Sequence, residues 1–435
     1  MKLSKFNELH CIDNDLFIYN HLSKRIVKIT ETSIIPTRDE LINNKKLLLG
    51  LQKNEMVVND FVNEDFLAEL SLNDYIFDKA LRLVLLPSED CNFRCTFCYE
   101  KFESVRMNQD VLDSLHRYLR KNITKFAELS VDWFGGEPLL AIPEITDFST
   151  RAIALATKAK IPYHASMTTN AYLLNIDTMR DMLKLKINSF HITLCGFKDE
   201  HDSIRYLKNG GGTFDVIIKN LLDIRSLIQS RSFRIIIRIN VAKRTLDTFE
   251  EFIAYLDDMF GGDDRFTFYF RPIGDWGGSR VKEISEDLYV TKEQIFERVL
   301  TVPSRLNYDI YYSLLSNNIC AASKRNNFVI RANGDINKCT ESLYTDYNNV
   351  GKLQANGEFQ LNAYSLSRWL NNNSEKFEKC SSCFKYALCR NKKCPDNLFK
   401  TDRIIDSYCG YEDLSILEIL KLLNTSNSKH IFTIA

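Results

Sequence analysis

The sequence of 435 residues has no excess of charge of either sign and no long apolar run. Its 57 Lys and Arg residues balance its 57 Asp and Glu residues, so no overall field attracts nucleic acid or an anionic membrane. No apolar stretch approaches the roughly 18 residues of a membrane span, and the opening MKLSKFNELHCIDND contains acids and no signal-peptide core. These absences predict a cytoplasmic protein that binds neither nucleic acid nor a membrane.

Cysteine, by contrast, is abundant, with twelve residues in the chain. In a reducing compartment thiols are kept for metals or chemistry rather than for disulfides. Three cysteines lie within residues 91–98 and seven within residues 320–409, whereas Cys11 and Cys195 stand alone. We expect the two isolated residues to be small buried apolar side chains and the two groups to bind metal.

The apolar pattern divides the chain into four segments. Residues 1–78 predict a small α+β module with a hairpin in LFIYNHLSKRIVKI and a helix near residues 38–51. Residues 79–280 alternate six buried strands with amphipathic helices, which predicts an α/β fold with a parallel sheet, a partial TIM-like (β/α)6 barrel. The pattern of residues 281–319 predicts a helical connector. Residues 320–435 are rich in loops, and we expect a domain organised by metal there. No internal repeat or low-complexity tract is present.

The first cysteine group follows the strand LRLVLLP directly. Cys91, Cys95 and Cys98 therefore lie on a loop at a strand's carboxyl end, where ligands bind in parallel α/β folds. Three thiolates can hold three corners of a 4Fe-4S cluster and leave one iron open for a substrate or cofactor. The spacing differs from the paired CxxC of structural zinc sites, which need four ligands and remain the alternative.

This CxxxCxxC motif, with Phe97 before its last cysteine and Tyr99 after it, resembles the signature of the radical S-adenosylmethionine (SAM) superfamily. The resemblance implies that SAM chelates the open iron and that the reduced cluster breaks its sulfonium bond to give a 5′-deoxyadenosyl radical. Cys91, Cys95 and Cys98 would then be the catalytic cluster ligands. The protein's part would be to position the cofactor, tune it and exclude water.

Further motifs resemble the same superfamily in order and placement. The resemblance implies that SAM is contacted by Tyr99, by the GGEP residues Gly135, Gly136, Glu137 and Pro138, by Asn170 with Thr169 beside it, and by Thr193, Arg205 and Asn240, with Arg238 on the same strand. Two positions depart from the pattern. Ala171 stands where relatives usually have glycine, and Cys195 where they commonly have aspartate, which we interpret as a spare thiol without a catalytic role.

The second cysteine group resembles the SPASM extension of peptide- and protein-modifying members, which carries two auxiliary 4Fe-4S clusters. By that resemblance Cys320, Cys339 and Cys394 hold one cluster, and Cys380, Cys383, Cys389 and Cys409 the other. Four residues separate Cys389 from Cys394 where three are usual, and no further cysteine precedes Cys320 within residues 281–319, so one auxiliary iron is expected to be open. A zinc module of CxxC and CxxxxC pairs is the alternative, but it leaves an odd cysteine unexplained.

Most of the chain resembles maturases of ribosomally made peptides (RiPP maturases). The resemblance implies a precursor peptide whose leader adds a strand to the N-terminal module, and an external electron donor of flavodoxin or ferredoxin type. The expected reaction takes a hydrogen from a core-peptide carbon and forms a cross-link, with a thioether favoured over a carbon-carbon bond. The alternatives are an anaerobic sulfatase-type maturase that makes formylglycine, and a non-catalytic iron-sulfur sensor or scaffold. Relatives of the sulfatase type have an aspartate after the position of Cys339, where this chain has Thr340 and Glu341.

Overall fold

The computed structural model describes residues 1–32, 34–274, 281, 290–308, 319–370, 383–384, 386, 394–396, 399, 416–425 and 431–434. The chain forms two compact units. One contains residues 78–309 and 324–370, and the other contains residues 1–77, 310–323 and 371–435. Within the described parts of both units, no helix has the length and apolar character that a membrane span requires.

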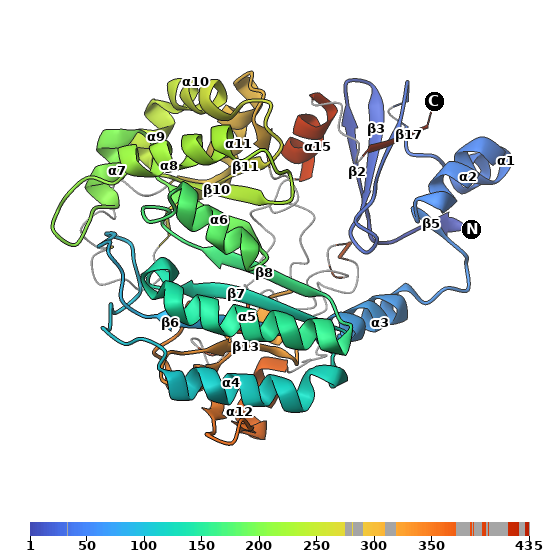
Figure 1. Cartoon of the computed structure of the whole chain (residues 1–435). Coiled ribbons are helices and arrows are strands. Elements are labelled where there is room, and N and C mark those ends of the chain that lie inside the picture. The colour runs from blue at the N-terminus through green and yellow to red at the C-terminus, as the bar shows by residue number, and fades with distance from the viewer. Residues whose placement is uncertain are drawn as a thin grey trace. The chain divides into compact units, whose positions relative to one another are not determined.

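The larger unit is built on one eleven-stranded sheet, in the order β12-β11-β10-β9-β8-β7-β6-β13-β14-β15-β16 (Figure 1). Its strands are β6 (Ala80–Ser88), β7 (Glu128–Gly135), β8 (Tyr163–Thr168), β9 (Ile187–Leu194), β10 (Arg234–Val241), β11 (Phe266–Pro272), β12 (Asn307–Tyr308), β13 (Asn327–Ile330), β14 (Asp335–Asn337), β15 (Asn349–Leu353) and β16 (Phe359–Leu361). The six strands β6 to β11 follow one another in space as in sequence, and every neighbouring pair is parallel. Their carboxyl ends therefore meet at one edge of the sheet.

Helices connect these strands, and Figure 1 shows α4 beside α5 along the outside of the sheet. They are α4 (Gln109–Asn122), α5 (Ile142–Ala159), α6 (Ile176–Lys184), α7 (Lys198–Ile204), α8 (Phe214–Leu227), α9 (Lys243–Asp247), α10 (Phe249–Phe260), α11 (Lys292–Thr301) and α12 (Ala363–Leu370), with short 3-10 helices η1 (Ile123–Lys125), η2 (Pro138–Ala141), η6 (Ala321–Ser323) and η7 (Asp346–Asn348). All but η6 belong to this unit. The six strand-helix repeats expected from the apolar pattern are therefore present, and they form the predicted partial barrel.

Local sequence explains why each connector is a helix. In α4 the side chain of Asn108 caps the amino end by accepting from the backbone N–H of Val111 at 3.0 Å. Leu112, Leu115 and Leu119 recur at helical spacing and are buried against the sheet side. Sequence therefore fixes both the start of this helix and the face it buries.

Strand β13 adds an extension that the sequence pattern did not predict. It pairs in parallel with β6, placing Asn327 opposite Arg82, and β14, β15 and β16 follow it as an antiparallel meander. The sequence prediction assigned residues 320–435 to a separate metal-organised domain. In the structure residues 324–370 belong to the same compact unit as β6.

The smaller unit contains two sheets and four helices among its described residues. The strands are β1 (Lys2–Leu3), β2 (Asn7–Ile12), β3 (Asp15–Asn20), β4 (Ile26–Ile29), β5 (Val57–Val58) and β17 (Ile431–Ile434), and the helices are α1 (Arg38–Asn43), α2 (Lys45–Lys53), α3 (Glu64–Ile76) and α15 (Ile416–Thr425). β1 pairs with β5, and the larger sheet has the order β17-β4-β3-β2. Its core joins both elements of the predicted hairpin to α2, through residues such as Leu16, Val27 and Leu51.

The hairpin predicted within residues 16–29 is β3 and β4, which pair in an antiparallel register with Tyr19 opposite Ile26. Cys11, expected to be buried, is exposed. It lies on β2, the edge strand of this sheet, where the alternation of the strand turns it away from the buried Ile12. The expectation for Cys11 was therefore wrong.

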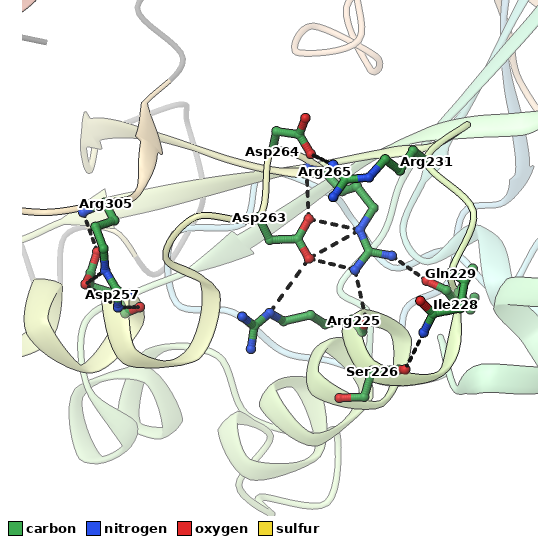
Figure 2. Close-up of polar contacts among 10 residues, drawn as sticks. All are labelled: Arg225, Ser226, Ile228, Gln229, Arg231, Asp257, Asp263, Asp264, Arg265 and Arg305. Carbon is green, nitrogen blue, oxygen red and sulfur yellow. Dashed lines mark hydrogen bonds and ion pairs between the residues drawn. The ribbon is translucent and has the colours of Figure 1, made fainter.

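A charged cluster ties the end of α8 to the start of β11 (Figure 2). The guanidinium of Arg265 donates to Asp263 at 2.9 and 2.6 Å and to the backbone oxygen of Arg225 at 2.8 Å, so it occupies carbonyls that the end of α8 leaves unpaired. Arg225 lies 3.7 Å from the same carboxylate. The hydrogen bonds from Arg265 hold the pKa of Asp263 below its usual value.

We predict that Asp263→Asn destabilises the larger unit by about 1.5–3 kcal/mol at neutral pH, because charge-assisted hydrogen bonds are lost from a largely buried site. A carboxylate with a lowered folded-state pKa contributes stability that is present above its unfolded pKa and lost as the pH falls through its folded pKa. The difference from the wild type should therefore shrink below about pH 4. Urea denaturation followed by tryptophan fluorescence measures it.

Asp264→Asn is the matched control, since Asp264 is exposed and pairs only with the exposed Arg231 in Figure 2. It should change the unfolding midpoint little, as surface ion pairs usually do. Equal effects of the two substitutions would contradict the assignment of a structural role to Asp263.

Candidate active site at the carboxyl edge of the sheet

The three clustered cysteines lie on the loop between β6 and α4, as predicted. Backbone hydrogen bonds hold this loop against the segment that follows α7: Arg94 N donates to Tyr206 O at 2.8 Å, Thr96 N to Ile204 O at 3.0 Å and Lys208 N to Asn92 O at 2.8 Å. The cysteine loop is therefore paired like a strand, and these bonds hold its shape.

The thiols of this loop are held away from water. Burial raises the pKa of Cys91 and Cys95 above the ordinary thiol value, and it raises that of Cys98 to about 12. A metal ligand must be a thiolate, so binding of a cationic cluster would release the protons of these thiols. The pocket is thus suited to a metal cluster and poorly suited to a free reactive thiolate.

The GGEP turn after β7 lies directly against the cysteine loop. Gly136 N donates to Ser88 O at 3.1 Å, and Glu137 N donates to Asp90 O at 3.0 Å. A Cβ atom on Gly136 would lie 2.3 Å from the oxygen of Asp90, and Gly135 has φ +108°. Both glycines are therefore required for the approach of the two loops to each other.

Glu137 is fully buried and joins the ends of β7 and β8. Its carboxylate accepts from Leu139 N at 3.0 Å, from Thr169 Oγ1 at 2.7 Å and from Asn170 N at 2.8 Å. Burial raises its pKa, and these hydrogen bonds oppose that effect. A carboxylate has about four lone-pair positions, so one acceptor position remains for a ligand such as an ammonium group.

Asn170 connects the end of β8 to the cysteine loop. Its side-chain amide donates to Asn92 Oδ1 at 2.7 Å and lies 3.7 Å from Cys91 Sγ. The next residue, Ala171, has φ +63°, in the left-handed region that favours glycine. This conformation accounts for the glycine that relatives usually have there.

Arg205 is a buried cation among the thiols. Cys95, Cys195, Cys91 and Cys98 all raise its pKa, against the opposing effect of burial, and its guanidinium lies 5.7 Å from the ring centre of Phe93. Its Nε atom has no hydrogen-bond partner within the described part of the chain. A buried polar atom without a hydrogen bond is costly, so an anionic group that accepted from this Nε would be stabilised here.

The remaining predicted contacts lie on β9 and β10. Thr193 is half-buried and stands opposite Arg238, whose Nε donates to the buried Asn240 at 2.7 Å. Cys195 is fully enclosed in an apolar cluster with residues such as Ile204, and its backbone N–H donates to Nδ1 of His201 at 3.3 Å. Pro138 is buried at the start of η2.

Sequence reasoning missed a second set of charged residues at this loop. Glu89, which precedes the cysteines, is buried and pairs with Arg331. The same arginine lies 3.3 Å from Glu103, which follows the cysteines. Tyr344 donates to Glu100 at 3.1 Å and accepts from Lys101 N at 3.1 Å. Burial raises the pKa of Glu100 to about 7. No local motif marks Arg331 or Tyr344, since both are distant in sequence.

Tyr99 lies within electrostatic range of both Cys98, in this loop, and Cys339. Burial raises the pKa of Tyr99 well above its usual value, and both Cys98 and Cys339 add to that rise, so the phenol is electrostatically coupled to both cysteines. The Cys339 loop is itself ordered by Asn348, which accepts from Cys339 N at 2.9 Å and donates to Cys339 O at 2.8 Å.

The other predicted auxiliary ligands are placed only in part. Cys320, Cys383 and Cys394 belong to the smaller unit, where Cys383 packs against an apolar cluster that includes Phe6 and Tyr386. Cys380, Cys389 and Cys409 lie outside the described residues. The division of these cysteines between two clusters stays a prediction.

The donor set of the larger unit fits an iron-sulfur cluster with an anionic ligand beside it. One buried and two half-buried thiols supply three corners, Arg205 supplies a positive group whose Nε has no partner among the described residues, and Glu137 keeps an acceptor position. The carboxylate and the ammonium of an amino acid moiety would complete the hydrogen bonding of both charged side chains.

Comparison with known families agrees with this geometry. Residues 85–256 match the family model described as "Radical SAM superfamily". The match spans the cysteine loop and the strands through β10, and it confirms the resemblance drawn from the CxxxCxxC spacing.

Individual relatives are more distant. The chain is 24% identical over 343 residues to the cysteine-type anaerobic sulfatase-maturating enzyme of Clostridium novyi, which covers 72% of this chain and 87% of that one. The structure of native anSMEcpe with bound AdoMet and Cp18Cys peptide matches with a TM-score of 0.57 at 18% identity, over 80% of this chain and 99% of that chain. SuiB of Streptococcus suis, bound to the precursor peptide SuiA, matches with a TM-score of 0.48 at 17% identity, over 93% and 97%. The fold shared with anSMEcpe confirms the predicted α/β class.

We predict that Gly136→Ala lowers the iron bound after anaerobic reconstitution severalfold, because the new methyl group meets the Asp90 carbonyl and forces the two loops apart. Iron and sulfide analysis with the absorbance near 400 nm, about the region of cluster charge-transfer bands, measures the loss. Gly211→Ala is the control, since its nearest contacts are side-chain atoms at 3.3 Å, and it should keep the wild-type iron content. Full iron in Gly136→Ala would contradict this reading of the turn.

We predict that Ala171→Gly is neutral or stabilises the fold by up to about 1 kcal/mol, because relief of the left-handed conformation offsets the entropy that glycine gains in the unfolded chain. Ala152→Gly, in the interior of α5, should instead destabilise by about 1 kcal/mol. Thermal melts of the two variants compare them. A loss in Ala171→Gly as large as in Ala152→Gly would show that residue 171 carries no strain.

Proposed function

We propose that this protein, a radical SAM enzyme, modifies a peptide by taking a hydrogen atom from one of its carbons and forming a cross-link. The observation that carries the proposal is the buried pocket at the carboxyl ends of β6 to β8, where three thiols, the Glu137 carboxylate and the Arg205 guanidinium converge. The radical SAM match at residues 85–256 covers the same residues.

When bound, a 4Fe-4S cluster and SAM supply a radical able to abstract hydrogen from an unactivated carbon. Cys91, Cys95 and Cys98 would hold the cluster. Glu137 would accept from the amino group of SAM, and Arg205 would neutralise its carboxylate, so that both charged groups gain the partner they lack. Asn170, Thr193, Asn240 and the GGEP backbone would orient the rest, while burial of the loop excludes water.

A peptide substrate is supported by the relatives. The anSMEcpe structure, which shares the fold, holds the Cp18Cys peptide, and the Clostridium novyi relative is named a sulfatase-maturating enzyme. We infer an external electron donor of flavodoxin or ferredoxin type, because reductive cleavage of SAM would consume an electron that must be resupplied.

We assign two auxiliary clusters to the SPASM-like cysteines. The ligand division remains as the sequence suggests, with one open iron on the cluster that uses Cys320, Cys339 and Cys394. In a thioether reaction the substrate loses one hydrogen from carbon and one from sulfur, a C–S bond forms, and the surplus electron leaves through an oxidant. The deoxyadenosyl radical would take the hydrogen atom from carbon, the thiol would release a proton, and an auxiliary cluster held by Cys320, Cys339 and Cys394 would accept the remaining electron.

Formylglycine formation is the second candidate, favoured by the Clostridium novyi relative. The residues after Cys339 argue against it. Relatives of the sulfatase type place an aspartate there, and here Thr340 is followed by Glu341, whose side chain is exposed rather than turned into a buried site. A thioether cross-link is therefore the first choice, followed by a carbon-carbon bond.

We predict that the anaerobically reconstituted protein, reduced with dithionite, binds about twelve irons per chain and cleaves SAM, because the proposal gives it three clusters and leaves one iron of the Cys91, Cys95 and Cys98 cluster open for SAM. Alanine at Cys91, Cys95 and Cys98 together should remove about four irons and abolish cleavage. Iron analysis and chromatography of 5′-deoxyadenosine measure both. Cys11→Ala is the control and should keep full activity, because that exposed thiol lies on β2 of the smaller unit, outside the pocket.

The bond type is tested with any short cysteine- or aromatic-bearing peptide that a reading frame adjacent to the gene encodes. A cross-link removes the mass of two hydrogen atoms, and a thioether also removes one alkylatable thiol, whereas formylglycine introduces an aldehyde that hydrazine reagents trap. Absence of SAM cleavage with a full iron content would contradict the enzyme itself and favour a sensor or scaffold. An aldehyde product would contradict the cross-link and favour the sulfatase-type reaction.

A further inference from the structure

Strand β17 occupies one edge of the small N-terminal sheet, although it lies about 400 residues along the chain from its partner (Figure 1). It pairs in parallel with β4 and places Ile431 opposite Ile26 and Ile434 opposite Ile29. The backbone N–H of Thr30 donates to the oxygen of Ile434 at 3.0 Å. The edge of β4 is thus filled by a segment of the same chain.

The side chains of β17 divide between the core and water. Ile434 is buried in the core that includes Leu16 and Leu51, and Phe432 packs against that core from the same face of the strand. Thr433, between them, is exposed. Gly50 on α2 makes room for this packing, because a Cβ atom there would lie 2.6 Å from Cδ1 of Ile434.

Two features make β17 easier to detach than the rest of the sheet. It pairs over only four residues, and parallel pairing is slightly less stable per residue than the antiparallel pairing between β3 and β4. It is also an edge strand with one neighbour, so its loss breaks no other pairing.

A groove of about 660 Å³ continues from the end of β17. Ile434 and Ile29 line its inner end, Leu47 and Lys45 of α2 line one wall, and Ile34, whose side chain is 70% exposed, lines the other. A segment that paired with β4 and ran on into this groove would bury more apolar surface than β17 does.

We propose that β17 is an internal competitor for the edge of β4, and that an extended substrate peptide docks there by displacing it. The inference rests on the proposed peptide substrate. The peptide takes its pattern from the strand it replaces: two apolar residues two positions apart, one of them branched and small enough to fill the Ile434 site beside Gly50. Main-chain hydrogen bonds supply most of the affinity. The positions that Phe432 and Ile434 occupy in the present strand supply the selectivity.

Displacement of β17 has a direct signature in the unmodified protein. The N–H of Thr30 is bonded to β17, whereas the N–H of Asn20 is bonded at 3.0 Å to Arg25 within the β3–β4 turn. If β17 detaches alone, Thr30 exchanges its amide hydrogen at least about tenfold faster than Asn20. Equal rates would mean that β17 leaves only when the whole module unfolds, which would overturn the proposal.

Docking is tested with a fluorescein-labelled synthetic peptide, NSKHIFTIA, which copies residues 427–435 of the chain. Fluorescence anisotropy should show at least about tenfold tighter binding to the full-length variant Ile434→Glu than to the wild type, because the competent fraction of β4 rises when its own strand is expelled. Thr433→Glu places the same charge on the exposed face of β17 and should bind the peptide as the wild type does. Equal binding by all three proteins would contradict the competition.

A second variant tests the same site independently, in case Ile434→Glu misfolds. Gly50→Leu keeps a helix-forming residue in α2 and fills the space that Ile434 uses. It should bind the peptide NSKHIFTAA, with alanine at the Ile434 position, more tightly than NSKHIFTIA, whereas Ile434→Glu should show the reverse order. The same order in both variants would show that the peptide binds elsewhere.

These measurements separate the two proposals. Peptide exchange at β4 requires neither SAM nor a cluster, so the inference fails on anisotropy and amide exchange alone. The proposed function fails on SAM cleavage and product mass, whatever these peptides do.

Discussion

The approach of the Gly135–Glu137 turn to the carbonyl oxygens of Ser88 and Asp90 is the contact on which the rest of the site depends. It fixes the end of β7 to the cysteine loop after β6, and the buried Glu137 carboxylate then fixes the end of β8 through Thr169 and Asn170. The side chain of Asn170 donates to Asn92, the neighbour of Cys91, and this bond completes a closed set of hydrogen bonds among the three strand ends. Because each bond is buried, a shift of one loop leaves polar groups unpaired in the others, and the cysteines keep their positions.

Sequence alone predicted the parts of the fold that depend on local pattern. Strands β6 to β11 are short apolar runs bounded by polar turns, and the helices between them have an apolar stripe such as Leu112, Leu115 and Leu119. It did not predict β13 beside β6 or β17 beside β4, because those strands are four residues long and their partners lie more than 200 residues away. The cysteine loop was found from its spacing, whereas Arg331 and Tyr344 carry no spacing signal and were missed.

The charges in the pocket favour the binding of an anionic group there. Arg205 is buried, its Nε has no partner among the described residues, and the thiols around it have pKa values raised by burial, so the Glu137 carboxylate is the group that opposes its charge in the protein alone. Such an arrangement costs stability. The cost falls when the thiols become thiolates on a metal cluster and a carboxylate reaches Arg205. The same residues that weaken the unliganded fold therefore favour binding, and folding and cofactor binding are coupled through them.

The clamp formed by Arg331 shows how the fold limits the freedom of the cysteine loop. Glu89 lies just before the three cysteines and Glu103 just after them, and one guanidinium contacts both. Glu89 N also donates to Val105 O at 3.0 Å, which closes the base of the loop. A buried ion pair adds little net stability once desolvation is counted, but closing the loop removes conformations that a flexible segment would have to lose on binding a cluster. Since Arg331 comes from the end of β13, the pairing of β13 with β6 serves the cysteines directly, and the segment that bears Cys339 is held next to the cysteine loop by the same residues.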